Sequence, residues 1–207
     1  DILLFDPISP AWARDLKRAV YSSTAARSRF AQAMDILGRP GAPTDEDTVF
    51  RKAVGLLTLG RTQAALELLG SLPPERPFAR FFQGKALLAA GRSDEAKTTL
   101  EQALSSTPGD HDVRVAYLDL IASREDPELL ERELQMGRHI ENTPDWFYFK
   151  GLIAQLRREF QAAIDDWEQA LELDPQHPKA LFLLACELDR RGEDEGALEL
   201  YERATAL

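Results

Sequence analysis

The sequence is poor in the residues that build disulfides, metal centres and nucleophilic active sites. Of its 207 residues one is cysteine, Cys186, and three are histidine: His111, His139 and His177. A single cysteine excludes an intramolecular disulfide and a thiolate metal cluster. The three histidines are far apart and show no ligand spacing. We therefore expect no metal site, no cofactor and no catalytic residues.

A membrane span and a basic surface are also missing. No apolar run approaches the roughly 18 residues that a membrane helix needs, so we expect no membrane association. The chain has 25 Lys and Arg against 35 Asp and Glu, a formal net charge of −10. Because such a chain repels phosphate backbones, we expect no nucleic-acid binding by this segment. The sequence begins at Asp1 rather than Met, so a targeting segment can lie outside it; we otherwise expect a cytoplasmic protein.

The charge is distributed unevenly along the chain. Residues 1–100 have a net charge of +3, whereas residues 101–207 have a net charge of −13. One interpretation is an ordinary solvated helical surface. The alternative is a polar molecule whose acidic half attracts a basic partner.

An internal repeat organises most of the sequence. When Gly84 is aligned with Gly151, three further residues match at the same offset of 67, close to two periods of 34: Ala96, Ala103 and Pro108 match Ala163, Ala170 and Pro175. Shifted by a further 34 residues, the same places hold Ala185, Ala197, Tyr201 and Ala204. A fixed period of this length indicates stacked units of one supersecondary motif.

Each unit has the pattern of two amphipathic helices joined by a tight turn. Gly91 interrupts the first helix of one unit, and we expect Ser93 to cap the next helix. Ala96, Leu100 and Ala103 then recur at helical spacing on one face. Small residues there allow the paired helices to approach closely. Caps are also expected at two other helix starts, where Asp126 and Thr143 precede Pro127 and Pro144.

These patterns predict an all-α fold, a right-handed solenoid of helical hairpins. Residues 1–40 are expected to form an N-terminal helical hairpin, a degenerate repeat, and residues 38–44 a linker. The solenoid then occupies residues 44–207, with repeats at about 46–76, 77–110, 111–143, 144–177 and 178–207. The repeat at 111–143 is degenerate because it lacks the small residues and has Leu129, Leu130 and Leu134 instead.

The spacings resemble the tetratricopeptide repeat, a helix–turn–helix unit of 34 residues, in a bacterial type of protein. The residues that carry the resemblance are Gly84, Leu87, Gly91, Ala96, Leu100, Ala103, Pro108, Phe147, Gly151, Ala163, Trp167, Ala170, Pro175, Leu181, Leu184, Ala185, Leu188, Ala197, Tyr201 and Ala204. Residues 178–204 also look like repeat segments of bacterial proteins that continue into a domain related to the RNA polymerase alpha C-terminal domain.

The resemblance implies a concave groove lined by the first helix of each repeat. Its second, fifth, ninth and twelfth places commonly face such a groove. The candidate partner-binding residues are Phe50, Val54, Phe78, Phe81, Lys85, Val115, Asp119, Tyr148, Leu152, Phe182 and Cys186. The alternative for the fifth-place aromatic residues is that they pack against the neighbouring repeat. Members that clamp a C-terminal carboxylate carry Lys at a fifth and Asn at a ninth place; both are missing here, which disfavours that ligand.

We therefore predict a non-enzymatic scaffold that binds a protein or peptide in its concave groove. One alternative is self-association into a homo-oligomer through an uncapped C-terminal repeat. Another is that the chain is the repeat part of a larger bacterial regulatory, transcription-associated protein. An enzyme would have to use Cys186, with His177 nine residues before it, and is disfavoured. A groove filled by the molecule's own residues would contradict the groove hypothesis.

Overall fold

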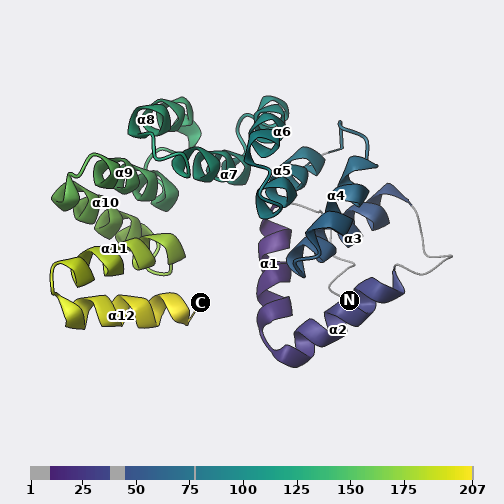
Figure 1. Ribbon diagram of the computed structural model, residues 1–207, viewed down its shortest axis with the longest axis horizontal. Coiled ribbons are helices and arrows are strands. Elements are labelled where there is room, and N and C mark those ends of the chain that lie inside the picture. Colours follow the sequence, from purple (N-terminus) through teal and green to yellow (C-terminus); the bar gives the residue numbers. More distant parts are fainter. Residues whose placement is uncertain (1–9, 38–44, 77, 207) are drawn as a thin grey trace. The chain divides into compact units, whose positions relative to one another are not determined.

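The computed structural model describes residues 10–37, 45–76 and 78–206. Within these ranges the chain forms twelve α-helices and a short 3-10 helix, with no strand, which confirms the predicted all-α fold (Figure 1). The expected linker at 38–44 lies outside the described residues. No helix in the described part of the chain is long and apolar enough to cross a membrane.

The chain divides into two compact units, Asp1–Ala116 and Tyr117–Leu207, which we describe separately and call unit 1 and unit 2. Unit 1 contains α1 (Pro10–Tyr21), α2 (Thr24–Ile36), α3 (Glu46–Thr58), α4 (Thr62–Gly70), α5 (Ala79–Ala89), α6 (Ser93–Ser106) and the beginning of α7 (His111–Ala122). Unit 2 contains the end of α7, α8 (Pro127–Met136), η2 (Arg138–Ile140), α9 (Pro144–Leu156), α10 (Phe160–Leu173), α11 (Pro178–Arg190) and α12 (Asp194–Thr205). Each of the five expected repeat ranges contains a pair of α-helices.

The helix starts follow the predicted caps at two positions and differ at a third. Thr143 and Asp126 accept hydrogen bonds from the backbone N–H groups of Trp146 and Leu129, and a proline follows each cap. The prediction for Ser93 is wrong, because Ser93 is the first residue of α6 and its predecessor makes no side-chain cap. The reason is the tight turn at Gly91, which has a φ of 74° and brings the chain into the next helix one residue early.

Small residues bring the paired helices close together. An added Cβ at Gly151 would lie 2.4 Å from Nε1 of Trp167, and one at Gly84 would lie 2.7 Å from Leu100. Trp167 is fully buried, and its indole N–H donates to the backbone oxygen of Tyr148 at 3.2 Å. The helix pairs α3–α4, α5–α6, α9–α10 and α11–α12 pack closely. The pair α7–α8 does not, consistent with the leucines that replace the small residues at 111–143.

Candidate protein-binding surfaces

The predicted groove residues fall into two sets, one in each unit. The inner surface of unit 1 is defined here by Phe50, Val54, Phe78, Phe81, Lys85, Asp112 and Val115, on α3, α5 and α7 and, for Phe78, directly before α5. The inner surface of unit 2 is defined by Asp119, Tyr148, Leu152, Lys179, Phe182 and Cys186, on α7, α9 and α11. These two surfaces differ in what covers their side chains.

In unit 1 three of the five predicted aromatic and aliphatic residues are almost completely buried. Phe50, Val54 and Phe81 belong to the core. The ring of Phe82 packs edge-on against Phe50 and Phe81, with centroids 5.5 and 4.9 Å away. Packing within the protein, the alternative that the sequence left open, therefore describes these three side chains. Of the other predicted residues, Phe78 and Val115 are half-buried and Lys85 is exposed, with Nζ 5.4 Å from the Phe81 ring centroid.

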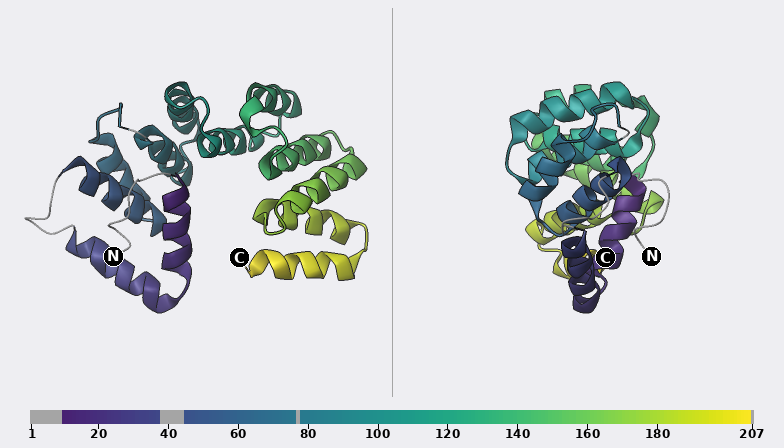
Figure 2. Two further views of the ribbon diagram at one scale, coloured as in Figure 1. Left: turned by 180° about the vertical axis from the view of Figure 1, so that it is seen from behind. Right: turned by 90° about the vertical axis from the view of Figure 1, so that its right-hand side faces the viewer.

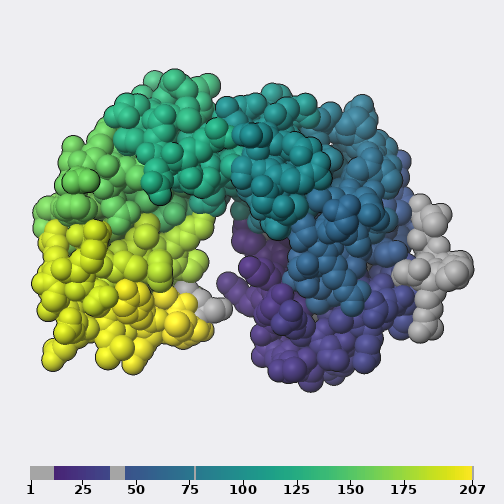
Figure 3. All heavy atoms as spheres, viewed as in Figure 1, coloured from purple at the N-terminus to yellow at the C-terminus, as the bar shows by residue number. Residues whose placement is uncertain are grey.

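An additional helix covers part of this surface. Helix α1 packs on α3, and the hydroxyl of Tyr21 donates to the backbone oxygen of Thr58 at 2.9 Å. At the other end of α1, Arg14 forms an ion pair with Asp112. In the space-filling view the purple atoms of α1 and α2 lie against blue atoms, in agreement with their packing on α3 (Figure 3). Helix α1 thus covers the part of unit 1 that it contacts, on α3 and at Asp112.

In unit 2 an exposed aromatic residue remains. Phe182 is 53% exposed, whereas Tyr148, at the equivalent fifth place of the preceding repeat, is 8% exposed. Leu152 and Cys186, both at ninth places, are half-buried. Together, Leu152, Phe182 and Cys186 give this surface an accessible apolar area.

A charged pair lies beside these apolar residues. The ammonium group of Lys179 on α11 is 2.5 Å from the carboxylate of Asp119 on α7. It also lies 5.3 Å from the centroid of the Tyr148 ring on α9. Sequence reasoning missed Lys179, although it occupies the second place of its repeat. The pair therefore links three helices that contribute to the inner surface.

Tyr148 and Tyr201 of unit 2 stay protonated at neutral pH. Burial, together with the negative charges of Asp119 and Asp145, raises the pKa of Tyr148. A hydrogen bond from the Tyr201 hydroxyl to Cys186 Sγ, 3.3 Å long, raises the pKa of Tyr201 to about 12. Both phenols act as neutral packing and hydrogen-bonding groups.

The two residues considered for catalysis have structural roles. His177 caps α11, since its Nδ1 accepts from the Ala180 N–H at 3.1 Å, and its Nε2 lies 3.3 Å from the Asp145 carboxylate. Cys186 accepts the hydrogen bond from Tyr201. In the described residues no group of three or more His, Cys, Asp or Glu side chains is placed to hold a metal ion.

The last helix pair of unit 2 has an open apolar face. Leu198 on α12 is 59% exposed, whereas Ile164, 34 residues earlier on α10, is 4% exposed. Helix α11 packs on α10 in this unit, and within the described residues no helix packs on α12 in the same way. Figure 2 shows α12 as the yellow helix at the end of unit 2.

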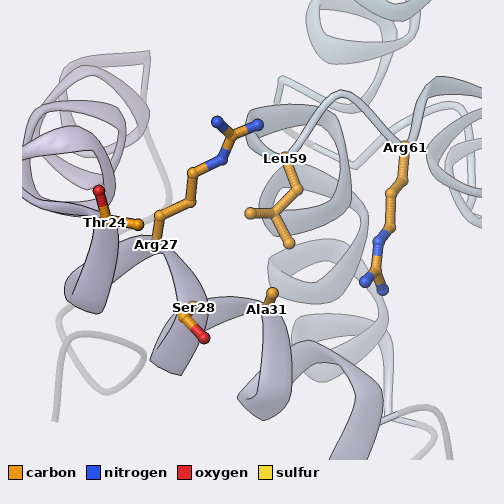
Figure 4. A pocket seen from close by; sticks show the side chains of 6 residues that line it. All are labelled: Thr24, Arg27, Ser28, Ala31, Leu59 and Arg61. Atoms are coloured by element: carbon orange, nitrogen blue, oxygen red, sulfur yellow. The ribbon is translucent and has the colours of Figure 1, made fainter.

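A shallow pocket of about 340 Å³ lies elsewhere, in unit 1, between α2 and the turn after α3. Its lining is Thr24, Arg27, Ser28, Ala31, Leu59 and Arg61. In Figure 4, Arg27 and Arg61 stand on opposite sides of Leu59. Arg61 is already paired with Asp35 at 2.5 Å.

Comparison with known proteins places this helical-repeat architecture in a family. The sequence model described as tetratricopeptide repeat matches residues 50–111, 81–129 and 148–207. These ranges contain most of the chain. The chain belongs to the tetratricopeptide repeat family, whose stacked helix pairs serve as protein-interaction scaffolds.

Similar sequences and structures agree with this assignment. The chain is 37% identical over 103 residues to the probable biofilm formation methyltransferase WspC of Pseudomonas aeruginosa, a match that covers 50% of this chain and 24% of that protein. The corresponding protein of Pseudomonas putida is 41% identical over 58 residues, 28% of this chain and 14% of its own length. The chain thus spans about a quarter or less of these relatives.

Solved structures support the fold alone. A thermophilic tetratricopeptide repeat protein of Thermus thermophilus is 19% identical, with a TM-score of 0.62, over 85% of this chain and 98% of that one. The Cut9–Hcn1 structure of the APC/C is 14% identical, with a TM-score of 0.74, over 96% of this chain and 40% of that one.

Proposed function

We propose that this chain is a scaffold that binds an amphipathic helix or an extended peptide of a partner protein on the inner surface of unit 2. The exposure of Phe182 at a groove-facing place carries the proposal. Exposed aromatic residues in such surfaces are typical anchors for a partner, and burying one contributes about 1.5–3 kcal/mol before ordering costs. Leu152 and Cys186 extend the apolar area.

The charges of unit 2 favour a basic partner. Unit 2 contains 10 Lys and Arg against 21 Asp and Glu, a net charge of −11. Such a field accelerates encounter with a cationic segment. A partner cation can compete with Lys179 for Asp119, which would add orientation to an otherwise apolar contact.

The test compares two exposed apolar residues. Phe182→Ala removes the proposed anchor, and Leu173→Ala removes a side chain of α10 that is 54% exposed and lies outside the defined inner surface. Both proteins, with the wild type, are used as bait in the source organism's lysate, followed by quantitative mass spectrometry. We expect at least one partner to be depleted about tenfold or more with Phe182→Ala only. Equal recovery of every partner by the three baits would contradict the proposal.

Self-association is a second candidate, favoured by the open face of α12. A second copy that covers Leu198 would give it a burial like that of Ile164. Light scattering over a range of protein concentrations tests this directly. We expect the mass to rise with concentration in the wild type and to stay at 23 kDa in Leu198→Ser. A wild-type mass of 23 kDa at every concentration would exclude self-association.

A third candidate follows from the similarity to WspC. We propose that the chain acts together with a methyltransferase, as the interaction part of a regulatory assembly. The supporting observation is the identity of 37% over half of this chain. Immunoprecipitation from native cells with a labelled methyl donor should show methyl transfer to a protein in the precipitate. A precipitate without label transfer would overturn this candidate.

A further inference from the structure

Helix α1 is tied to unit 1 at two separated points. Tyr21, at its C-terminal end, donates to the backbone oxygen at Thr58, the last residue of α3. Arg14, near its start, pairs with Asp112 in the first turn of α7. In the order of the repeats, α5 is stacked between α3 and α7. A helix fixed to both therefore extends from the last residue of α3 to the first turn of α7. In Figure 1 α1 lies alongside α3 and below α5.

The sequence of α1 has the amphipathic pattern of helices that bind in grooves: apolar residues on one face and charged residues on the other. Trp12, Leu16 and Val20 recur every fourth residue, and the side chains of Leu16 and Val20 are buried. Asp15, Lys17 and Arg18 are exposed. Apolar anchors at this spacing, with charges on the other face, are how an amphipathic helix is recognised by a helix-lined groove. Here the recognition takes place within one molecule.

Helix α2 has its own attachment to the repeats. Met34 and Phe30 of α2 lie so close to Gly55 of α3 that an added Cβ there would be 2.5 Å from Met34 Sδ and 3.1 Å from Phe30 Cζ. Helices α1 and α2 are separated by a turn of two residues, Ser22 and Ser23. The packing of α2 on α3 therefore holds the hairpin on unit 1 by contacts that do not involve α1.

We propose that the inner surface of unit 1 is a helix-binding site which α1 occupies in cis, and that its external ligand is a basic amphipathic helix with the chemistry of α1. Such a helix has apolar residues at every fourth position and a cation that reaches Asp112. It binds only when α1 leaves. This inference does not rest on the proposed function, which concerns the inner surface of unit 2.

Because α1 belongs to the same chain as its binding surface, an external helix must compete with it. A tethered segment competes at an effective concentration of the order of millimolar. An external helix with the same contacts as α1 is therefore excluded at micromolar concentration. The Arg14–Asp112 pair is exposed on the Arg14 side, so it contributes at most about a fivefold preference. Most of the docking comes from Leu16 and Val20.

The test uses a fluorescent peptide of residues 10–22 and the full chain. Binding is measured by fluorescence anisotropy to the wild type and to Leu16→Asp, whose own α1 cannot dock. We expect the peptide to bind Leu16→Asp about tenfold to a hundredfold more tightly than the wild type. The matched control is the same peptide with Leu16→Asp, which should bind neither protein. Equal affinity of the unmodified peptide for both proteins, at equal helicity by circular dichroism, would overturn the proposal.

A charge exchange provides a test with exposed residues that do not threaten folding. In the chain, Arg14→Glu sets two like charges against each other, and we expect the unmodified peptide to bind about fivefold more tightly. The double variant Arg14→Glu with Asp112→Arg restores the cis pair, and peptide binding should return to the wild-type level or below. If Arg14→Glu leaves peptide binding unchanged, or if the double variant does not reverse its effect, α1 does not compete with the peptide for this surface.

Discussion

The two units use the same repeat but present different inner surfaces. In unit 1 the fifth-place aromatic residues Phe50 and Phe81 are buried, and α1 packs on α3, the helix that carries Phe50. In unit 2 Tyr148 is buried, but Phe182 stays half-exposed next to the Lys179–Asp119 pair. The difference teaches that residue type at a repeat position does not decide availability for binding. What packs on the repeat decides it.

The electrostatics reinforce this contrast. Unit 1 contains 15 Lys and Arg against 14 Asp and Glu, and unit 2 contains 10 against 21. Helix α1, which packs on unit 1, is basic on its exposed face. Unit 2 is acidic and repels anionic partners. Under the two proposals, both surfaces bind cationic helices, one supplied by the chain itself and one by another molecule.

The largest difference is expected between the free-energy losses caused by Leu16→Ala and by Phe182→Ala. Leu16→Ala removes a side chain that is 1% exposed and leaves a cavity, so we expect a loss of about 2–5 kcal/mol in the free energy that holds α1 in place. Phe182→Ala should change the free energy of unfolding by only about 0.5 kcal/mol, because the ring is half in solvent. Amide hydrogen exchange of α1 and chemical denaturation measure the two effects. Comparable losses for both would remove the distinction between a filled and an open surface.

The helix pairs of the two units should tolerate an added methyl group differently. Gly151→Ala forces a Cβ against the buried indole of Trp167, and we expect a destabilisation of about 1–3 kcal/mol. Gly84→Ala meets Cγ and Cδ2 of the buried Leu100 side chain, both at 2.7 Å. Leucine is smaller and less rigid than an indole ring, and the gain in helix propensity of about 1 kcal/mol offsets part of the cost. Urea denaturation followed by circular dichroism compares the two. If Gly84→Ala is the more harmful change, the close packing of α9 and α10 is not what selects glycine.

The ion pairs on the two inner surfaces should contribute little and similarly. Lys179 and Asp119 are both more than a third exposed, and so is Arg14. We expect Lys179→Ala and Arg14→Ala each to cost about 0.2–1 kcal/mol, an effect that shrinks in 1 M salt. Thermal denaturation at low and high salt is the measurement. A salt-independent loss for Lys179→Ala would assign its effect to contact with the Tyr148 ring rather than to the ion pair.

The smallest expected difference is in how acid affects the N-terminal caps of α3 and α9. Asp45 caps α3 by accepting from the Thr48 N–H at 2.9 Å and the Thr48 hydroxyl at 2.7 Å, and these bonds lower the Asp45 pKa below its ordinary 3.8. Thr143 caps α9 with an uncharged hydroxyl. The Asp45 contribution is present above the ordinary pKa and is lost as the pH falls through the lowered value.

Amide exchange of Thr48 should therefore accelerate relative to that of Trp146 when the pH is lowered below about 4, after correction for intrinsic rates. Asp45→Asn keeps an acceptor at the cap and should abolish this relative change. Parallel behaviour of the two amides in the wild type would show that acid acts on the whole repeat array and not through the Asp45 cap.

The sequence by itself determined the all-α repeat fold and several of its details. The 34-residue spacing of Gly84, Gly151 and the alanines follows from close helix packing, which is local enough to leave a pattern. The caps at Asp126 and Thr143 are also local, since a cap involves residues three apart. Ser93 was misplaced because the turn at Gly91 shifts the helix start by one residue, a detail of backbone geometry.

Only the tertiary structure decided which inner residues are accessible. Phe81 and Phe182 occupy the same place in the repeat, and nothing in their neighbours along the chain distinguishes them. Phe81 is 2% exposed and Phe182 is 53% exposed, a difference that the place in the repeat does not predict. Contacts between segments far apart in sequence are equally hidden from the repeat pattern: Arg14 with Asp112, Tyr21 with Thr58, and Lys179 with Asp119. Such contacts arise from stacking and leave no periodic signal, because a single residue pair determines each of them.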